Sequence, residues 1–348
     1  MLRMTENRSL LTDAGKILFF SGDDFLEHIV NGNDCFVCGA KAGSVPFNEE
    51  HVIPDWILRR YDLHEKRITV PGGSGLVYSR YRVPCCESCN ALMGKVFEEP
   101  ISDLVTKGYD AIVQHLKDQG PRLIFVWLNL IFLKTHLKDR SFLVNRDTRV
   151  QSGSIGEQYD WPELHHIHCV ARSFYTGAEL SARAVSSVLV FPAKTGTPLG
   201  DFDYADYHAG RSLLLRLGEV VFISVLNDSC GALNILWEDL KKLTGPLSPL
   251  QTLELLAHFS YANLLMENRP IFYSQLDVDK ETLTILADLP ELIERSDYIP
   301  AEFGEILYSI LSTKEVSLPG PELTKEYIRQ GRWTFLFDSE GRFATNAL

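Results

Sequence analysis

The spacing of apolar residues predicts several helices along the chain. Apolar residues follow a helical period over 90–118, and Pro100 is expected to divide this segment into two helices. The most apolar helix is expected over 120–144, which contains the run LIFVWLNLIFL. A further helix is expected to begin after the N-cap residue Ser248 and to end before Pro270.

Short apolar runs bounded by Gly, Pro, Asn and Asp predict strands elsewhere. An alternating strand is expected from Leu76 to Val83, after a Gly-rich loop. Further β-rich runs lie at 165–175, 186–193 and 216–228, and the tail 332–345 is expected to form a hairpin around DSEG.

These elements predict an α+β protein with a small N-terminal module and a larger C-terminal domain. Residues 1–33 form a lead-in whose segment DDFLEHIVNGND reads as one helix, and residues 34–100 hold the clustered cysteines. Residues 101–348 form the larger α+β domain, to which the sequence assigns no ligand. We expect that domain to act as a sensor, regulatory or dimerisation element for the module.

Composition and charge narrow the class of protein. Apolar residues make up 45% of the 348 positions, as in ordinary globular proteins. The formal net charge of −12 argues against a passive nucleic-acid coat protein but allows a local basic site. The apolar run Leu123–Leu133 is shorter than the ~20 residues of a membrane span, and the N-terminus lacks the apolar core of a secretory signal. We therefore expect a cytoplasmic protein without a membrane partner.

The cysteines of the N-terminal third form two C-x2-C pairs, Cys35 with Cys38 and Cys86 with Cys89. In a reducing compartment such pairs indicate metal ligands before disulfides. Two such knuckles suit one closed, tetrahedral site for a structural Zn²⁺. Cys85 precedes Cys86, and only the spacing favours Cys86 as the ligand. Unliganded core cysteines are the alternative.

Two further features accompany the knuckles. The segment EEHVIPDW lies between them, and Asn90 directly follows Cys89 in CCESCN. A plain zinc ribbon needs neither feature. Together these motifs resemble the HNH endonuclease family, in the branch that reads C-x2-C, (D/E)-H-(V/I)-x-P and C-x2-C-N. The resemblance covers about residues 34–100 and implies a zinc-stapled ββα-metal module.

The resemblance implies a site that hydrolyses phosphodiester bonds in DNA. It implies His51 as the general base, a role that suits imidazole because its pKa lies near neutrality. It implies that Glu50 and Asn90 hold a catalytic Mg²⁺ or Mn²⁺, since hard divalent ions prefer oxygen ligands. The zinc would fix the strand of Glu50 and His51 against the helix that carries Asn90.

The chain departs from the family pattern at several positions. Glu50 stands where Asp is common, Tyr81 where many members have Asn, and Asn90 where many have His. Glu98, further along the same helix, is a reserve metal ligand, with a solvent-facing carboxylate as the alternative. His64 lies outside the motif and is expected at the surface.

A basic segment leads from the motif to the second knuckle. Its only opposing acids are Asp62 and Glu65, and tyrosines are interleaved with the basic residues. This composition suits sequence-independent contact with phosphates, and an ordinary solvated loop is the alternative. The basic residues are Arg59, Arg60, Lys66, Arg67, Arg80 and Arg82.

Three classes of function follow from the sequence. The first is an endonuclease acting on double-stranded DNA, in which a homodimer would pair two nicking sites. The second is a catalytically inactive zinc module that binds nucleic acid or a protein partner. The third is a sensor–effector, in which the C-terminal domain recognises a regulatory ligand or partner and licenses cutting, as in bacterial antiviral defence.

Overall fold

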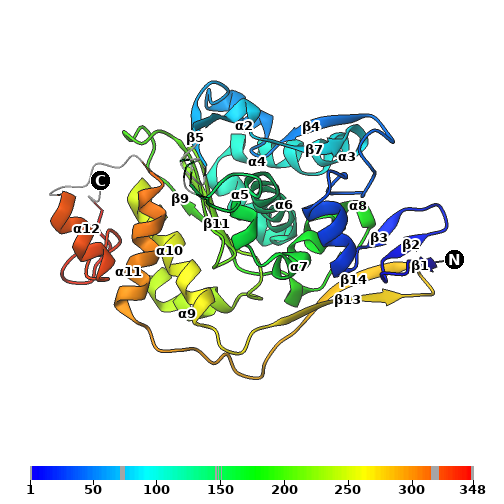
Figure 1. Cartoon of the computed structure of the whole chain (residues 1–348). Coiled ribbons are helices and arrows are strands. Elements are labelled where there is room, and N and C mark those ends of the chain that lie inside the picture. The colour runs from blue at the N-terminus through cyan, green and yellow to red at the C-terminus, as the bar shows by residue number, and fades with distance from the viewer. Residues whose placement is uncertain are drawn as a thin grey trace. The chain divides into compact units, whose positions relative to one another are not determined.

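The computed structural model describes residues 2–70, 75–145, 147, 149, 151–314 and 321–345. These residues form two compact units, each assembled from separate stretches of the chain. Unit 1 spans residues 1–103, 126–184 and 272–287, and unit 2 spans residues 104–125, 185–271 and 288–348. Both units contain helices and strands, in agreement with the α+β class (Figure 1). The predicted Gly-rich loop at 71–74 lies outside the described residues.

Unit 1 begins with a small antiparallel sheet of three short strands, β1 (Leu2–Met4), β2 (Leu10–Thr12) and β3 (Ile17–Phe19). The predicted helix of the lead-in follows as α1 (Gly22–Asp24) and the π-helix η1 (Phe25–Val30). It buries Phe25, Ile29 and Val30, so the lead-in contributes to the core of unit 1.

A two-stranded antiparallel ladder and one helix follow. Strand β4 (Phe47–His51) pairs with β7 (Arg82–Cys86), and β7 runs directly into α3 (Glu87–Met93) (Figure 1). Between the strands lie α2 (Asp55–Arg60), the hairpin of β5 (Arg67–Thr69) and β6 (Gly75–Val77), and the 3₁₀ turn η3 (Tyr78–Arg80). The single strand expected from Leu76 to Val83 is therefore wrong, because η3 interrupts it.

Pro100 does not break the helix that follows, contrary to the sequence prediction. The chain stays helical through α3, the π-helix η4 (Gly94–Glu98) and α4 (Glu99–Lys107). Proline lacks an N–H, and the π-turn before it already shifts the hydrogen bonds, since Glu99 N–H bonds to Gly94 O. The break comes instead at Gly108, whose φ of 89° ends the helix.

The predicted apolar helix is α6 (Arg122–Asp139), which is buried almost throughout. The segment 165–175, expected to be β-rich, is helical in α7 (Trp161–Ala171) and α8 (Ser173–Thr176). The periodic apolar residues begin at Trp161, before the histidine-rich run, and Pro162 stands at the start of the helix. Three strands form a sheet in the order β13 (Ile271–Asp277), β14 (Thr282–Asp288), β8 (Glu179–Leu180). The remaining elements of this region are the 3₁₀ turns η5 (Ile155–Gln158) and η6 (Ala182–Ala184).

Unit 2 is built on an antiparallel sheet in the order β10 (Phe202–Tyr207), β11 (Ser212–Leu217), β12 (Val220–Val225), β9 (Val188–Pro192). The two central strands are buried at every position, and apart from Ser212, Arg216 and Ser224 their residues are apolar. Helices α10 (Pro249–Leu265) and α5 (Tyr109–Gln119) pack on this sheet, and α9 (Gly231–Leu240), α11 (Pro300–Ser312) and α12 (Pro321–Arg329) extend the helical layer.

In unit 2 the sequence prediction for the helix after Ser248 is confirmed, and the predicted tail hairpin is present only as an isolated bridge. Ser248 caps α10, and Gln251 completes a capping box with it. The tail forms an antiparallel bridge between Phe337 and Phe343, closed by the hydrogen bond from Asp338 N–H to Arg342 O.

Candidate functional site

The first cysteine knuckle lies between η1 and β4. Ala40 N–H donates to Cys38 Sγ, and Gly39 N–H donates to Cys35 O. Gly39 has a φ of 76°, and a Cβ there would lie 2.5 Å from the ring of Phe20. Only glycine therefore fits this tight turn, which points both thiols the same way.

The second knuckle completes a tetrad. Cys86 ends β7, and Cys89 lies in the first turn of α3. The four sulfur atoms of Cys35, Cys38, Cys86 and Cys89 all lie within 4.8 Å of one another, and Cys38 Sγ is 3.6 Å from Cys86 Sγ. Tetrahedral zinc with Zn–S bonds of ~2.3 Å requires sulfur separations of about 3.8 Å. The tetrad can hold a metal ion such as zinc.

Cys85 is a fifth thiol, buried beside the tetrad. Its Sγ lies 3.8 Å from Cys35 Sγ, while Cys86 Sγ belongs to the tetrad. Hydrogen bonds from the thiols of Cys38, Cys85 and Cys89 lower the pKa of Cys35. A thiolate, which is the form that binds zinc, is thus favoured at the centre of the cluster.

Helix α7 supports the first knuckle from outside the predicted module. His168 Nε2 lies 2.9 Å from Phe36 O, and the Arg172 guanidinium donates to Val37 O at 2.8 Å and to Ile17 O at 2.7 Å. Burial holds the pKa of His168 well below its ordinary value, so the ring is neutral and donates through Nε2. These residues position the knuckle backbone.

The ladder of β4 and β7 places the motif residues. Phe47 pairs with Cys86 at one end, and His51 pairs with Arg82 at the other. Consecutive strand residues point to opposite faces, so Glu50 and His51 face opposite sides of the ladder. On α3, Asn90 Nδ2 donates to Asn48 Oδ1 at 3.0 Å.

Glu50 is buried and paired with a lysine of α6. Lys134 Nζ lies 2.7 Å from Glu50 Oε1 and 2.8 Å from His51 O, and the two side chains are 3% and 6% exposed. Helix α6 also receives a hydrogen bond from Tyr81 Oη to Asp139 Oδ1 at 2.7 Å. The ladder is thereby tied to α6, a link that sequence reasoning missed.

Glu98 is half-buried rather than solvent-facing. Burial raises its pKa to about 7, against the opposing effect of Lys134, and the negative charges of Glu50 and Asp55 add to the rise. The carboxyls of Glu50 and Glu98 therefore share one cation, Lys134, in the interior of unit 1.

His51 lies on the other, more accessible face. Arg82 Nε donates to His51 Nε2 at 3.1 Å, and the His51 side chain is 16% exposed. Burial is the main cause that lowers the pKa of His51, and the positive charge of Arg82 adds to it. The imidazole is therefore neutral near pH 7 with its unprotonated nitrogen at Nε2, as a general base requires.

Two residues that sequence reasoning did not assign to the site lie beside His51. Asp55 Oδ1 lies 4.0 Å from His51 Nε2 and 2.9 Å from His64 Nε2, and Asp55 also pairs with Arg59. Burial raises the pKa of Asp55, but hydrogen bonds from His64 and Arg59 outweigh it and leave the pKa below its ordinary value. The position of Asp55, four residues after His51 in the motif segment, was an available signal.

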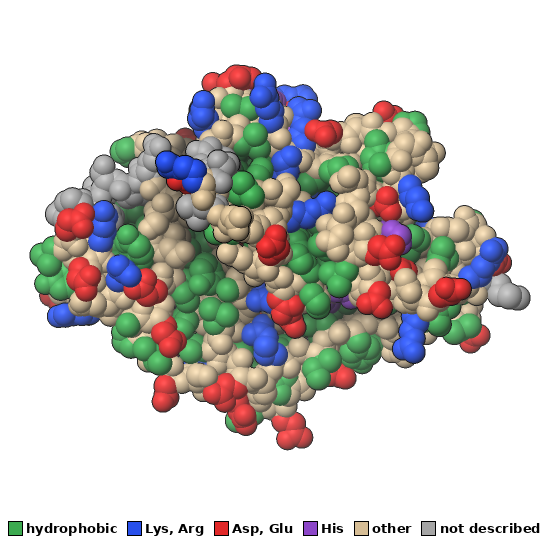
Figure 2. All heavy atoms as spheres, viewed as in Figure 1, with side chains coloured by type: hydrophobic (Ala, Val, Ile, Leu, Met, Phe, Trp, Pro, Cys, Tyr) green, Lys and Arg blue, Asp and Glu red, His purple; other side chains and the backbone are tan. Residues whose placement is uncertain are grey.

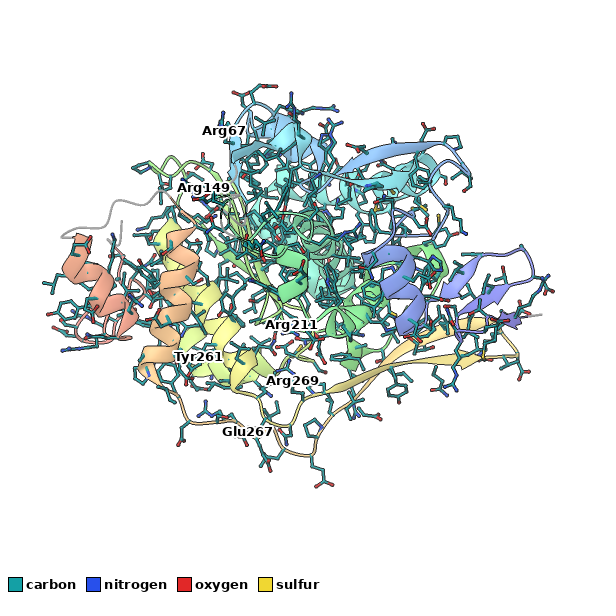
Figure 3. The ribbon with its side chains drawn as sticks, in the orientation of Figure 1. Arg67, Arg149, Arg211, Tyr261, Glu267 and Arg269 are labelled. Atoms are coloured by element: carbon teal, nitrogen blue, oxygen red, sulfur yellow. The ribbon has the colours of Figure 1, made fainter. Side chains whose placement is uncertain are left out.

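Most of the predicted basic residues lie at the surface. Arg59, Arg60, Lys66, Arg67 and Arg80 are exposed, and Arg82 is half-buried against His51. Figure 2 shows Lys and Arg side chains gathered over α2 and β5, and Figure 3 labels Arg67 there. A local basic surface thus lies over α2 and β5, although the net charge of the chain is negative.

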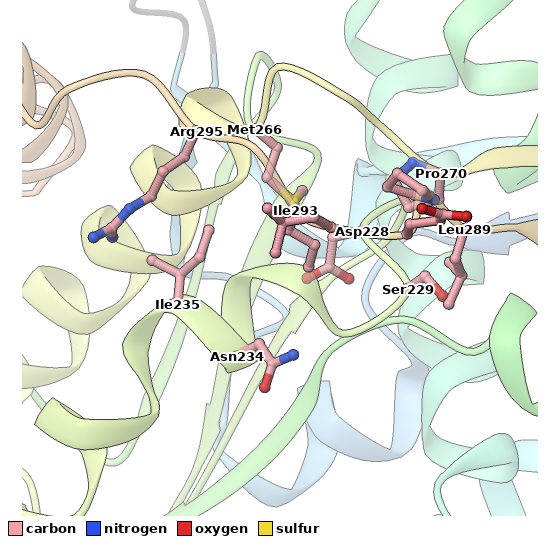
Figure 4. Close-up of a pocket in the computed structure, with 12 residues that line it drawn as sticks. Asp228, Ser229, Asn234, Ile235, Met266, Pro270, Leu289, Ile293 and Arg295 are labelled. Atoms are coloured by element: carbon pink, nitrogen blue, oxygen red, sulfur yellow. The ribbon is translucent and has the colours of Figure 1, made fainter.

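Unit 2 contains a cavity of about 570 Å³ (Figure 4). Its lining combines apolar residues such as Met266 and Ile293 with polar ones such as Asn234 and Arg295. Asp228, also in the lining, accepts hydrogen bonds from Ser187 and from Ala232 N–H, which indicates a structural role. The cavity does not identify a ligand by its chemistry.

Among the described residues, no helix combines the length and apolar character needed to cross a bilayer. Comparisons with protein-family models, with curated proteins and with solved structures find no match for this chain.

Proposed function

We propose that the chain is a metal-dependent endonuclease of the HNH type that hydrolyses phosphodiester bonds in DNA. The observation that carries the proposal is the ladder of β4 and β7 with α3, which has the cysteine tetrad at one end and His51 at the other. A neutral, partly accessible imidazole beside an arginine and a basic surface suits phosphodiester hydrolysis.

His51 takes the proton of the attacking water at Nε2. In the free protein Arg82 donates to that nitrogen. A scissile phosphate attracts the guanidinium more strongly than a neutral imidazole does, so Arg82 turns to the phosphate and a water molecule takes its place at Nε2. Attack of the water oxygen on phosphorus then breaks the bond to the leaving oxygen.

Glu50 and Asn90 are the residues that would hold the catalytic Mg²⁺ or Mn²⁺. Lys134 contacts Glu50 through Oε1, so the second carboxylate oxygen is the one that would bind the ion. Asn90 donates a hydrogen bond through Nδ2, so its amide oxygen is the atom that would bind the ion. Oxygen donors of this kind suit a hard divalent ion. The fit is incomplete, because the Glu50 carboxylate is buried against Lys134 and lies on the face of the ladder opposite His51. When bound, the ion would supply positive charge at the phosphate and the leaving oxygen.

A plasmid-cleavage assay tests the proposal. Purified protein with Mg²⁺ or Mn²⁺ is expected to nick or cut supercoiled DNA, and His51→Ala is expected to abolish cleavage while zinc content and the unfolding temperature stay unchanged. Wild-type protein that cuts no DNA with either ion would contradict the proposal.

One observation favours the second candidate, a catalytically inactive zinc module that binds nucleic acid or protein. The Lys134–Glu50 ion pair places a fixed cation against the proposed metal ligand. Tight DNA binding by a wild-type protein that is inert with every metal would favour this candidate.

We also propose that unit 2 carries the regulatory role expected of the C-terminal domain, with its cavity as the location for a small ligand. A sensor–effector of bacterial defence would be silent until that ligand or a partner is present. A homodimer would bring two nicking sites together, and a strict monomer in light scattering would exclude that arrangement.

A further inference from the structure

The histidine outside the motif shares a carboxylate with the proposed general base. His64 follows α2, and its Nε2 lies 2.9 Å from Asp55 Oδ1, which is also 4.0 Å from His51 Nε2. Backbone hydrogen bonds fix this turn, since Leu63 N–H bonds to Leu58 O and Ser79 N–H bonds to His64 O. The His64 ring is therefore held in place by both its backbone and Asp55.

The contact with Asp55 leaves the other ring nitrogen available. Among the described residues, His64 Nδ1 has no hydrogen-bond partner, and the side chain is 35% exposed. A carboxylate at one ring nitrogen orients an imidazole, so the opposite nitrogen is held in a fixed direction from which it can exchange a proton with a substrate oxygen.

The separation of the two rings suits a single phosphoryl group. The ring centroids of His51 and His64 lie 6.5 Å apart, with the ring planes perpendicular. An acid and a base each need to come within about 3 Å of the oxygen they serve. Arg82 contacts His51 and Arg59 pairs with Asp55, so two cations accompany the histidine pair.

We propose that His64, oriented by Asp55, is the general acid that protonates the leaving oxygen, an inference that rests on the proposed endonuclease function. Water attacks phosphorus and gives its proton to His51 Nε2. The bond from phosphorus to the leaving oxygen breaks, and His64 Nδ1 gives its proton to that oxygen. The products are a phosphomonoester and an alcohol, and solvent returns the proton from His51 to His64.

The dependence on the leaving group tests this role. The substrates are plasmid DNA, whose alkoxide leaving group needs a proton, and bis(4-nitrophenyl) phosphate, whose nitrophenolate leaves without one. We expect His64→Gln to slow plasmid cleavage by about 10²–10⁴-fold and to leave nitrophenyl cleavage within a few-fold of wild type. His51→Ala is expected to slow both reactions.

His28→Gln is the matched control, because His28 is 34% exposed and also pairs with a carboxylate, Asp34. It is expected to cut both substrates at the wild-type rate. Retained nitrophenyl cleavage by His64→Gln also demonstrates that the variant folds. Equal losses on both substrates, or no loss on either, would overturn the role of His64 while the endonuclease stands. Inactive wild-type protein would overturn the endonuclease function, and the acid with it.

Discussion

The Lys134–Glu50 pair allows the most direct test of how unit 1 is stabilised. The change is Lys134→Met, which keeps an unbranched side chain, one atom shorter, and removes the charge. Lys134 is 3% exposed and Glu50 6%, at 2.7 Å. Exposed ion pairs contribute ~0–1 kcal/mol, whereas removing one partner of a buried pair costs about 3–5 kcal/mol. We expect the larger loss, because Glu50 would keep a buried charge and His51 O would lose its donor.

Urea unfolding followed by tryptophan fluorescence measures this loss. Trp56 and Trp127 stack in unit 1 with ring centroids 6.4 Å apart, so their emission reports on this region. The double variant Lys134→Met/Glu50→Met is expected to recover most of the stability, since an apolar pair of similar volume leaves no charge buried.

Lys241→Met is the matched control. Lys241 pairs with Glu238 at the same 2.7 Å, but the side chains are 52% and 80% exposed. It is expected to cost under about 1 kcal/mol. If Lys134→Met lowers the free energy of unfolding no more than Lys241→Met does, burial does not increase the contribution of the Lys134–Glu50 pair to stability. The reasoning is then refuted.

Three further outcomes are expected. Metal analysis should find one zinc ion per chain, and Cys89→Ser should lose it together with stability of unit 1; a metal-free wild-type protein would contradict the zinc site. The pKa of Glu98, about 7 in the folded protein against an ordinary 4.5, means that its contribution to stability is full below pH 4.5 and is lost as the pH rises through about 7. Glu98→Gln should therefore be more stable than wild type at pH 8, with a smaller gain at pH 5. If the unfolding midpoint of the variant differs from that of wild type by the same amount at both pH values, the raised pKa of Glu98 is contradicted. Arg67→Ala should weaken binding to all DNA sequences alike and reduce the salt slope by about 1, whereas a sequence-dependent loss would indicate base contact.

Local spacing predicted the parts of the site that depend on neighbouring residues. The C-x2-C pairs bring Cys35, Cys38, Cys86 and Cys89 together as expected, and Ser248 caps its helix. The sequence predictions were wrong where structure beyond the local residue spacing determines the conformation. The π-turn before Pro100 absorbs its missing N–H, a compensation that proline rules alone do not reveal.

The ion pairs of the site depend on contacts that spacing does not encode. Lys134 reaches Glu50 from 84 residues away. The sequence did contain an indication of this ion pair, because a lysine within an otherwise apolar helix needs a buried partner. His64 meets Asp55 only because the chain turns sharply at Asp62, which has a φ of 52°. A single sequence gives no indication of that turn.

The interleaving of unit 1 has a consequence for synthesis on the ribosome. The segment 47–93 carries the proposed active site, but Lys134, His168 and Arg172, which hold its strand and knuckle, are made later. Nascent chains fold from the N-terminus as their partners emerge. The proposed nuclease element therefore reaches its final geometry only after residue 172 has been translated, and a shorter nascent chain would lack the contacts that hold the site.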